Sequence, residues 1–152
     1  ETILSMRNNV DDVVIISFAM FIGYFVTQSD STIISNWSFE LLFFHKSLVL
    51  IFIPTVMAIT SFIGIHPVIS STVLLSVFTG ETFDLNQALI MQAHLIGWCS
   101  GTMSSIASLS VITCSNLYDI PSHKIAFGIN IYIALLFSII GGSILCLLSL
   151  IF

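Results

Sequence analysis

An apolar run from Leu48 to Phe78 constrains this chain more than any other feature. It contains no formally charged residue, yet Gly64-Ile65-His66-Pro67 interrupts its middle. A run of this length can enter a bilayer, where backbone outside a helix is tolerated only if protein buries it or if it lines a cavity. The run therefore predicts a membrane segment that is broken at a functional position.

The composition places the chain in the membrane class. Of its 152 residues, 57% are hydrophobic and only 7% are charged, whereas a soluble domain carries roughly 25% charged residues. The net charge of −5 offers no basic surface for nucleic acid. We expect an integral protein of the inner or plasma membrane, in contact with the lipid bilayer. The start at Glu1 rather than Met indicates part of a longer chain, in which residues 1–152 form a single membrane domain.

Four apolar blocks predict an all-α fold, a polytopic transmembrane helical bundle. They cover residues 13–27, 47–79, 85–117 and 125–152. A straight helix over the second block would be about 50 Å long, whereas the hydrocarbon core is roughly 30 Å thick. We therefore expect Gly64 and Pro67 to divide this block, and a second break at Gly97–Gly101. Both are predicted to be broken helices or re-entrant hairpins.

Local signals indicate where the helices begin. Asp84, followed by Gln87, resembles a capping box and predicts the start of the third helix. Ser122 is the expected N-cap of the fourth block. Within that block, Gly141-Gly142 permits close packing or a kink.

The connectors suggest an orientation. The segment Asp30–Lys46 is expected to lie at the membrane interface because it mixes aromatic and charged residues. If each block crosses the membrane once, Lys46 and Lys124 lie on the same side, which the positive-inside rule makes cytoplasmic. A re-entrant hairpin in one of the broken blocks would change this count.

Polar groups beside the first break indicate a solute site. Proline suits the first turn of a helix, so a half-helix starting at Pro67 would present free N–H groups and nearby hydroxyls to an anion. His66 would add a hydrogen bond or a proton; the alternative is a kinked span whose histidine bonds a neighbouring carbonyl. The candidate substrate-binding residues are Gly64, His66, Pro67, Ser70, Ser71, Thr72, Gly101, Ser104, Ser105, Ser108, Ser115 and Asn116.

A hydroxyl-rich segment follows the second expected break. Seven Ser or Thr residues lie among the fourteen residues from 102 to 115. Gly97, Gly101 and Ser105 are spaced four apart, a stripe that packs membrane helices closely. The hydroxyls occupy several helical faces, so packing alone does not use them all. A polar hairpin tip at Ser115-Asn116, or a half-helix that faces a solute, would use the rest.

His94 admits two interpretations. With Gln87, seven residues earlier on the same helical face, it can form a buried polar pair that bridges helices. Alternatively, His94 joins His66 as a candidate proton relay. The apolar blocks contain no carboxylate, which argues against an autonomous proton pump. No hydrolase, kinase, phosphate-loop or metal-ligand motif is present, so we expect no enzyme, cofactor or metal.

The layout resembles one half of an inverted-repeat secondary transporter of the ion transporter superfamily, which includes dicarboxylate, citrate, gluconate and arsenite carriers. Gly64-Ile65-His66-Pro67 is similar to a Gly-x-Asn-Pro element of the dicarboxylate branch, with His66 in place of Asn. Ser115-Asn116 is similar to its Ser-Asn-Thr hairpin tip, with Leu117 in place of Thr. The resemblance implies a small anionic solute, coupling to Na⁺ or H⁺, and a homodimer or association with the rest of a longer transporter.

These observations predict a permease domain that moves a small anion by alternating access. Half-helix N-termini near Pro67 and Gly101 would stabilise the anion. One alternative is a small non-catalytic subunit whose Gly/Ser stripe docks a larger membrane complex. A membrane-embedded enzyme is a further alternative, although no acid–base pair is visible for it.

Overall fold

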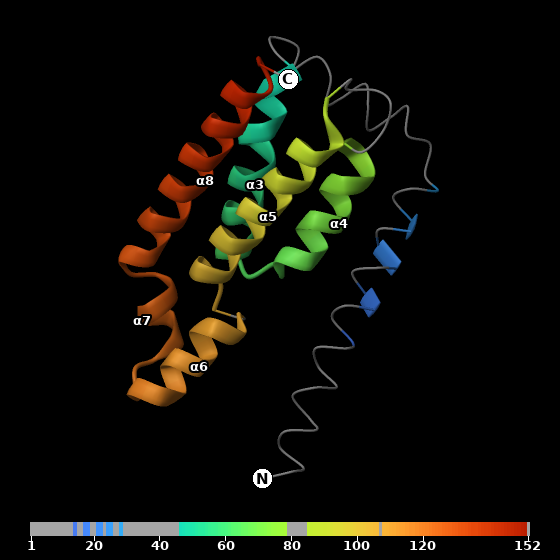
Figure 1. Cartoon of the computed structure of the whole chain (residues 1–152). Coiled ribbons are helices and arrows are strands. Elements are labelled where there is room, and N and C mark those ends of the chain that lie inside the picture. Colours follow the sequence, from blue (N-terminus) through green and yellow to red (C-terminus); the bar gives the residue numbers. More distant parts are fainter. Residues whose placement is uncertain are drawn as a thin grey trace.

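The chain is built of helices (Figure 1). The computed structural model describes residues 46–78, 85–106 and 108–151, with residues 14, 17, 18, 21, 22, 24, 25 and 28. No strand occurs among these residues, so the all-α prediction is confirmed for them. The seven described residues of the first block are helical, as is residue 28. The expected interfacial segment lies outside the described residues, apart from Lys46.

Four helices form the body of the fold. A 3-10 turn, η1 (Lys46–Leu48), leads into α3 (Val49–Phe62), and α4 (Pro67–Phe78) follows the first break. The later helices are α5 (Gln87–Ser104), α6 (Leu109–Tyr118), α7 (Ser122–Ala126) and α8 (Ile129–Leu148). Helices α3, α5 and α8 each pack against the other two, and α4 packs on α3 and α5. Helices α6 and α7 lie beyond the lower end of α5 and α8 in Figure 1.

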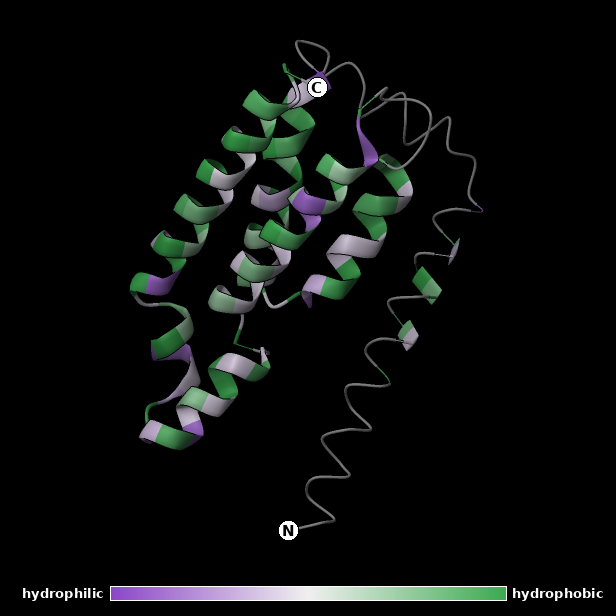
Figure 2. Ribbon diagram, in the orientation of Figure 1, coloured by the Kyte–Doolittle hydropathy of each residue, from purple (hydrophilic) through white to green (hydrophobic). Residues whose placement is uncertain are grey.

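Small residues predominate on the inner face of α8, and large apolar residues line its outside. On α8 the buried residues are Ala134, Ser138, Gly142 and Leu145, at helical spacing. The outward side chains of the same helix include Leu136, at 58% exposure, and Figure 2 shows the helix apolar along most of its length. A soluble helix would place polar residues outside, so this pattern suits an apolar environment.

Glycines allow the helices to approach closely. A Cβ on Gly97 would lie 3.0 Å from Pro54 Cα, and a Cβ on Gly142 would lie 2.7 Å from Ile51 Cα. The prediction of close packing is therefore confirmed at Gly142, and the packing role of the stripe at Gly97 and Gly101 is confirmed as well. Ser105, the third member of the stripe, lies just beyond the end of α5 and has an extended backbone.

Two stretches of the described chain are long and apolar enough to cross a membrane. They are Gln87–Tyr118, which contains α5 and α6, and Ile129–Leu148, which is α8. Helices α3 and α4 have 14 and 12 residues and are shorter. At a rise of about 1.5 Å per residue, α8 reaches about 30 Å, whereas α4 reaches about 18 Å.

The direction of α4 changes the expected orientation of the connectors. Helix α3 runs down in Figure 1 and α4 runs back up beside α5, so the second block is a hairpin and not a single crossing. Lys46 therefore lies at the upper end of the bundle, near the end of α8, while Lys124 in α7 lies at the lower end. The count of four single crossings, on which the expectation of one shared side depended, therefore does not describe this arrangement.

Three expected helix boundaries also differ. Helix α5 begins at Gln87 because Asn86 caps it, its side chain accepting from Ala88 N at 2.9 Å; Asp84 lies outside the described residues. The fourth block is divided at Gly128 into α7 and α8. Ser122 begins α7 but makes no capping hydrogen bond, and Pro121 is the N-cap residue.

Candidate functional site

The turn between α3 and α4 is a glycine-terminated helix end. Gly64 has φ +100, a conformation that costs other residues energy because of their Cβ. The N–H of Ile65 donates to Thr60 O at 3.0 Å, and the N–H of Gly64 donates to Ser61 O at 3.1 Å. This pair of bonds is the Schellman motif, which satisfies carbonyls that the end of α3 leaves free. The chain thus leaves the helix at the predicted position for a local, backbone reason.

His66 closes the other side of this turn. Its Nδ1 accepts from Val68 N at 3.3 Å, and its carbonyl accepts from Ser70 N at 3.5 Å, so it acts as the N-cap of α4. Pro67 is the first residue of the helix, where its missing N–H leaves no bond unmade. The ring nitrogen Nδ1 is therefore an acceptor here, and the proton of a neutral ring is on Nε2.

The second break lies between α5 and α6, several residues beyond the expected position. The helix continues through Gly101 because the glycines are used for close packing, and the backbone becomes extended at Ser105 (φ −94, ψ 127). Ser108 caps α6, its Oγ accepting from Val111 N at 3.2 Å and donating to Thr102 O at 2.6 Å. Ser110 Oγ donates to the same Thr102 oxygen at 3.2 Å. The half-helix expected near Gly101 therefore begins after Ser108.

The last turn of α5, just before the second break, lies against the first break. A Cβ on Gly101 would lie 2.5 Å from Ser61 Oγ and 3.1 Å from Pro67 Cγ, so the end of α5 contacts the α3–α4 turn. The rings of His66 and Trp98 also meet edge to face, with centroids 6.4 Å apart. Helices α4 and α6 start close to this contact and run away from it in opposite directions (Figure 1). Their positive N-terminal ends are thus directed at one region.

Polar side chains join α4 to its two neighbours. Thr60 of α3 and Ser70 of α4 share a hydrogen bond of 2.7 Å, and Ser71 Oγ lies 3.3 Å from His94 Nδ1 of α5. Two polar atoms beside these pairs are buried with no hydrogen-bond partner among the described residues: Ser61 Oγ and His94 Nε2. A buried polar group without a partner costs about 1–3 kcal/mol, so both positions are suited to a further hydrogen-bonding group.

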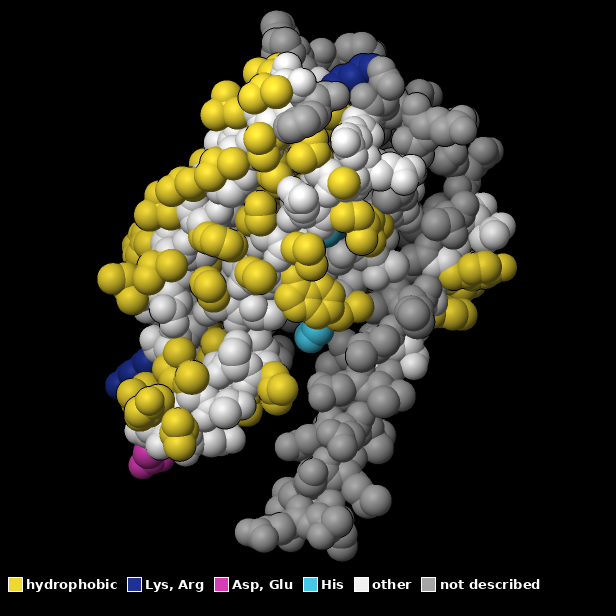
Figure 3. All heavy atoms as spheres, viewed as in Figure 1, with side chains coloured by type: hydrophobic (Ala, Val, Ile, Leu, Met, Phe, Trp, Pro, Cys, Tyr) yellow, Lys and Arg dark blue, Asp and Glu magenta, His cyan; other side chains and the backbone are white. Residues whose placement is uncertain are grey.

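The four packed helices around the breaks carry no formal charge. Helices α3, α4, α5 and α8 contain no Asp, Glu, Lys or Arg. On the face seen in Figure 3, the charged side chains of the described residues lie near the two ends and apolar atoms lie between them. A solute at the breaks would therefore meet hydroxyls, helix N-termini and histidine as its polar contacts.

The structure places the predicted site residues in several different positions. Pro67 and Gly101 meet at the first break, beside His66, and Ser70 and Ser71 lie one turn further along α4. Ser104, Ser105 and Ser108 are buried at the end of α5 and the start of α6. Thr72 donates to Val68 O of its own helix at 2.7 Å. Gly64 supplies the turn conformation and has open space where a Cβ would be.

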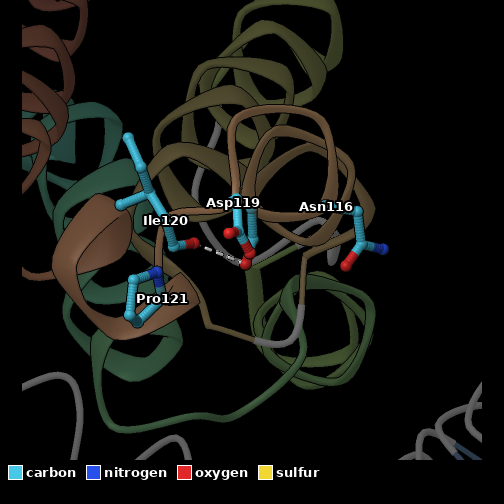
Figure 4. A pocket seen from close by; sticks show the side chains of 5 residues that line it. Asn116, Asp119, Ile120 and Pro121 are labelled. Atoms are coloured by element: carbon cyan, nitrogen blue, oxygen red, sulfur yellow. Dashed lines mark hydrogen bonds between the residues drawn. The ribbon is translucent and has the colours of Figure 1, made fainter.

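Ser115 and Asn116 lie elsewhere, at the far end of α6. There they line an open hollow of about 280 Å³ together with Asp119, Ile120 and Pro121 (Figure 4). Ser115 Oγ donates to Ile120 O at 2.7 Å, and Asp119 ends the helix in a left-handed conformation with φ 52. The tip predicted at Ser115-Asn116 is therefore a helix end distant from the two breaks.

Sequence reasoning did not single out Ser61 or Thr60. Ser61 continues the buried face of α3 at helical spacing, after Pro54, Met57 and Ala58. A serine on an otherwise apolar face, three residues before a helix-ending glycine, was the available signal. Its contact with Gly101 depends on α3 and α5 packing together, which the local pattern does not reveal.

Comparison of the chain with models of protein families, with curated proteins and with solved structures finds no match. The functional interpretation therefore depends on the site itself, since a fold alone does not define an activity.

Proposed function

We propose that this chain is a membrane-embedded permease domain that moves a small anion by alternating access. The observation that carries the proposal is the contact between the last turn of α5 and the first break, where Gly101 meets Ser61 and Pro67. In discontinuous membrane helices, half-helix N-termini offer unpaired N–H groups and a positive dipole end to an anion. The starts of α4 and α6 would provide these here.

The residues at the breaks have the chemistry that such a site needs. Ser61 is fully buried and its Oγ has no partner among the described residues, so it can donate to an anion without losing a protein contact. Uncharged donors bind an anion reversibly, which a carrier requires if the solute is to leave again. Ser104, Ser105 and Ser108 would line the same region from the α5 side, and His66 would lie at the opening of the turn.

The surroundings favour a bilayer as the location. The outer side chains of α8 are large and apolar, and its inner residues are small. Such a helix packs through small residues and exposes its apolar side chains to lipid. Moving a solute across would need a second domain of this kind, supplied by the rest of a longer chain or by a second copy.

The alternative of a docking subunit finds less support. It required the Gly97 and Gly101 stripe to be available to a partner, but α3 and the α3–α4 turn already occupy it. We therefore do not retain that hypothesis.

The test is exchange of anions across sealed vesicles that contain the full-length protein. Labelled succinate, citrate and gluconate would be the probes, measured by counterflow. We expect counterflow of at least one probe, and Ser61→Ala should raise its half-saturating concentration about tenfold or more, because a hydrogen bond to a charged group contributes about 1.5–3 kcal/mol. The unfolding free energy should not fall, since the substitution removes a buried hydroxyl that has no partner among the described residues.

Ser138→Ala is the matched control. Ser138 is also fully buried, but its hydroxyl donates to Ala134 O within α8, away from the breaks. We expect this variant to exchange the anion normally. Equal effects of both substitutions, or no counterflow of the three probes, would contradict the proposal.

A further inference from the structure

His94 is a buried histidine with one ring nitrogen used and one unused. It is 5% exposed, near the middle of α5. Its Nδ1 lies 3.3 Å from Ser71 Oγ of α4, while Nε2 has no partner among the described residues. One ring nitrogen thus joins two helices that flank the candidate site, and the other is available to a proton or an acceptor.

No other titratable group is buried around it in the described part of the chain. Helices α3 and α4 contain no Asp, Glu, Lys, Arg, His, Cys or Tyr. On α5 the other titratable residue is Cys99, which is exposed, and α8 contributes Tyr132 and Cys146. The charged residues Lys46, Lys124 and Asp119 lie outside these four helices. Among the buried side chains of these four helices, His94 is therefore the titratable one; His66, which is half-buried, lies in the α3–α4 turn, where its Nδ1 accepts from Val68 N.

Ser71 is suited to both protonation states of the ring. A hydroxyl can donate to a neutral Nδ1 and can accept from a protonated one, because it has both a proton and lone pairs. When the ring is protonated, the Ser71 proton can turn to a carbonyl of its own helix, as the Thr60 and Thr72 hydroxyls do. The contact between α4 and α5 is then kept while the charge changes.

We propose that His94 binds a proton that is carried together with the anion, which makes this domain a proton-coupled symporter. The inference rests on the proposed function and selects H⁺ over Na⁺ as the coupling ion. Protonation converts the neutral imidazole into a cation by adding one proton from the aqueous side, and release to the opposite side restores the neutral ring.

The coupling has an electrostatic basis. A lone cation is unfavourable in an apolar bundle without carboxylates, and so is a lone anion. His94 and Gly101 are seven residues apart on α5, which corresponds to about 10 Å along the helix. At that separation the two opposite charges stabilise each other in a medium of low polarity. By linkage, the anion raises the affinity for the proton as much as the proton raises the affinity for the anion.

The experiment uses the full-length protein in sealed, sodium-free vesicles with a trapped pH-sensitive dye. Labelled succinate, citrate or gluconate is added outside, and solute counterflow is measured in parallel with proton entry. In the wild type we expect proton entry on addition of the exchanged probe, and an acid-outside gradient should raise its uptake about tenfold, within the usual range of coupling.

His94→Gln is the decisive variant, because glutamine keeps a hydrogen-bonding partner for Ser71 but takes up no proton. It should retain counterflow and lose both proton entry and the response to the gradient. His123→Gln is the matched control, an exposed histidine of α7 outside the four packed helices, and it should keep the gradient response. Two variants test the contact between Ser71 of α4 and His94 of α5. Ser71→Ala should weaken the response to the pH gradient, and Ser71→Thr, which keeps the hydroxyl, should restore it.

The outcomes separate the two proposals. If counterflow occurs without proton entry, or if His94→Gln keeps the gradient response, proton coupling at His94 is refuted and the permease proposal stands. If none of the probes is exchanged by the wild type, both proposals are refuted.

Discussion

The closest approach of a glycine to the backbone of another helix allows a quantitative test of the packing. Gly142 of α8 lies against the backbone of α3, where an added Cβ would be 2.7 Å from Ile51 Cα and 2.8 Å from Leu50 O. Gly141, the next residue back, would place its Cβ 3.0 Å from two side-chain atoms of Ile96. The two glycines are adjacent in one helix, but only one of them faces backbone.

The expected effect of Gly142→Ala follows from these contacts. Ordinary contact begins at 3.4 Å, so α3 and α8 would have to separate by about 0.7 Å. Overpacking costs about 1–3 kcal/mol, and two backbone contacts place this site in the upper half of that range. The better helix propensity of alanine offsets this loss by about 0.5–1 kcal/mol of unfolding free energy. A net loss of about 1–2.5 kcal/mol remains, a factor of roughly 5–70 in the folded-to-unfolded ratio.

Gly141→Ala is the control, because it gains the same propensity and the Ile96 side chain can turn away. We expect its stability to be about that of the wild type. Both variants would be measured by equilibrium unfolding of the full-length protein in mixed micelles with increasing SDS, followed by circular dichroism. If Gly142→Ala is as stable as Gly141→Ala, α8 does not pack on α3 as described and the reasoning is refuted.

Three further predictions concern the hairpin. In a cysteine-free background, Lys46→Cys and Lys124→Cys should react with an impermeant maleimide from opposite sides of sealed vesicles; labelling from one side would mean that the second block crosses once. Gly64→Ala should lower the unfolding free energy by about 1–2 kcal/mol because φ at this position is +100, whereas Gly64→Asn should lower it less. Both variants would be measured by unfolding in SDS. His66→Ala should lower the unfolding free energy by about 0.5–2 kcal/mol and speed amide hydrogen exchange at Val68, because the cap of α4 is lost. His66→Asn should keep the cap, and equal exchange rates in the two variants would argue against capping.

Local chemistry made the first break predictable. Gly64 and Pro67 act through their own backbones, one by adopting a positive φ and the other by lacking an N–H. Their effect can therefore be predicted from four consecutive residues. The all-helical class was equally accessible, because long uncharged apolar runs require internally bonded backbone in a membrane.

The second break was misplaced for a related reason. A glycine inside a helix costs only about 1 kcal/mol relative to alanine, and close packing against α3 outweighs this at Gly97 and Gly101. The helix ends instead where serine side chains replace backbone partners, with Ser108 as the cap. In a segment with seven hydroxyls the sequence does not show which one caps.

The sequence by itself determined the helical class, the apolar character of the surface and the place where α3 ends, because these depend on residues close together in the chain. Only the tertiary structure decided that α4 turns back, that Lys46 and Lys124 lie at opposite ends, and that the first break meets the last turn of α5 at Gly101. It also brought Ser71 to His94 and moved Ser115 and Asn116 away from the site. These features depend on which helix faces pack together, and that choice is made by side chains far apart in the sequence.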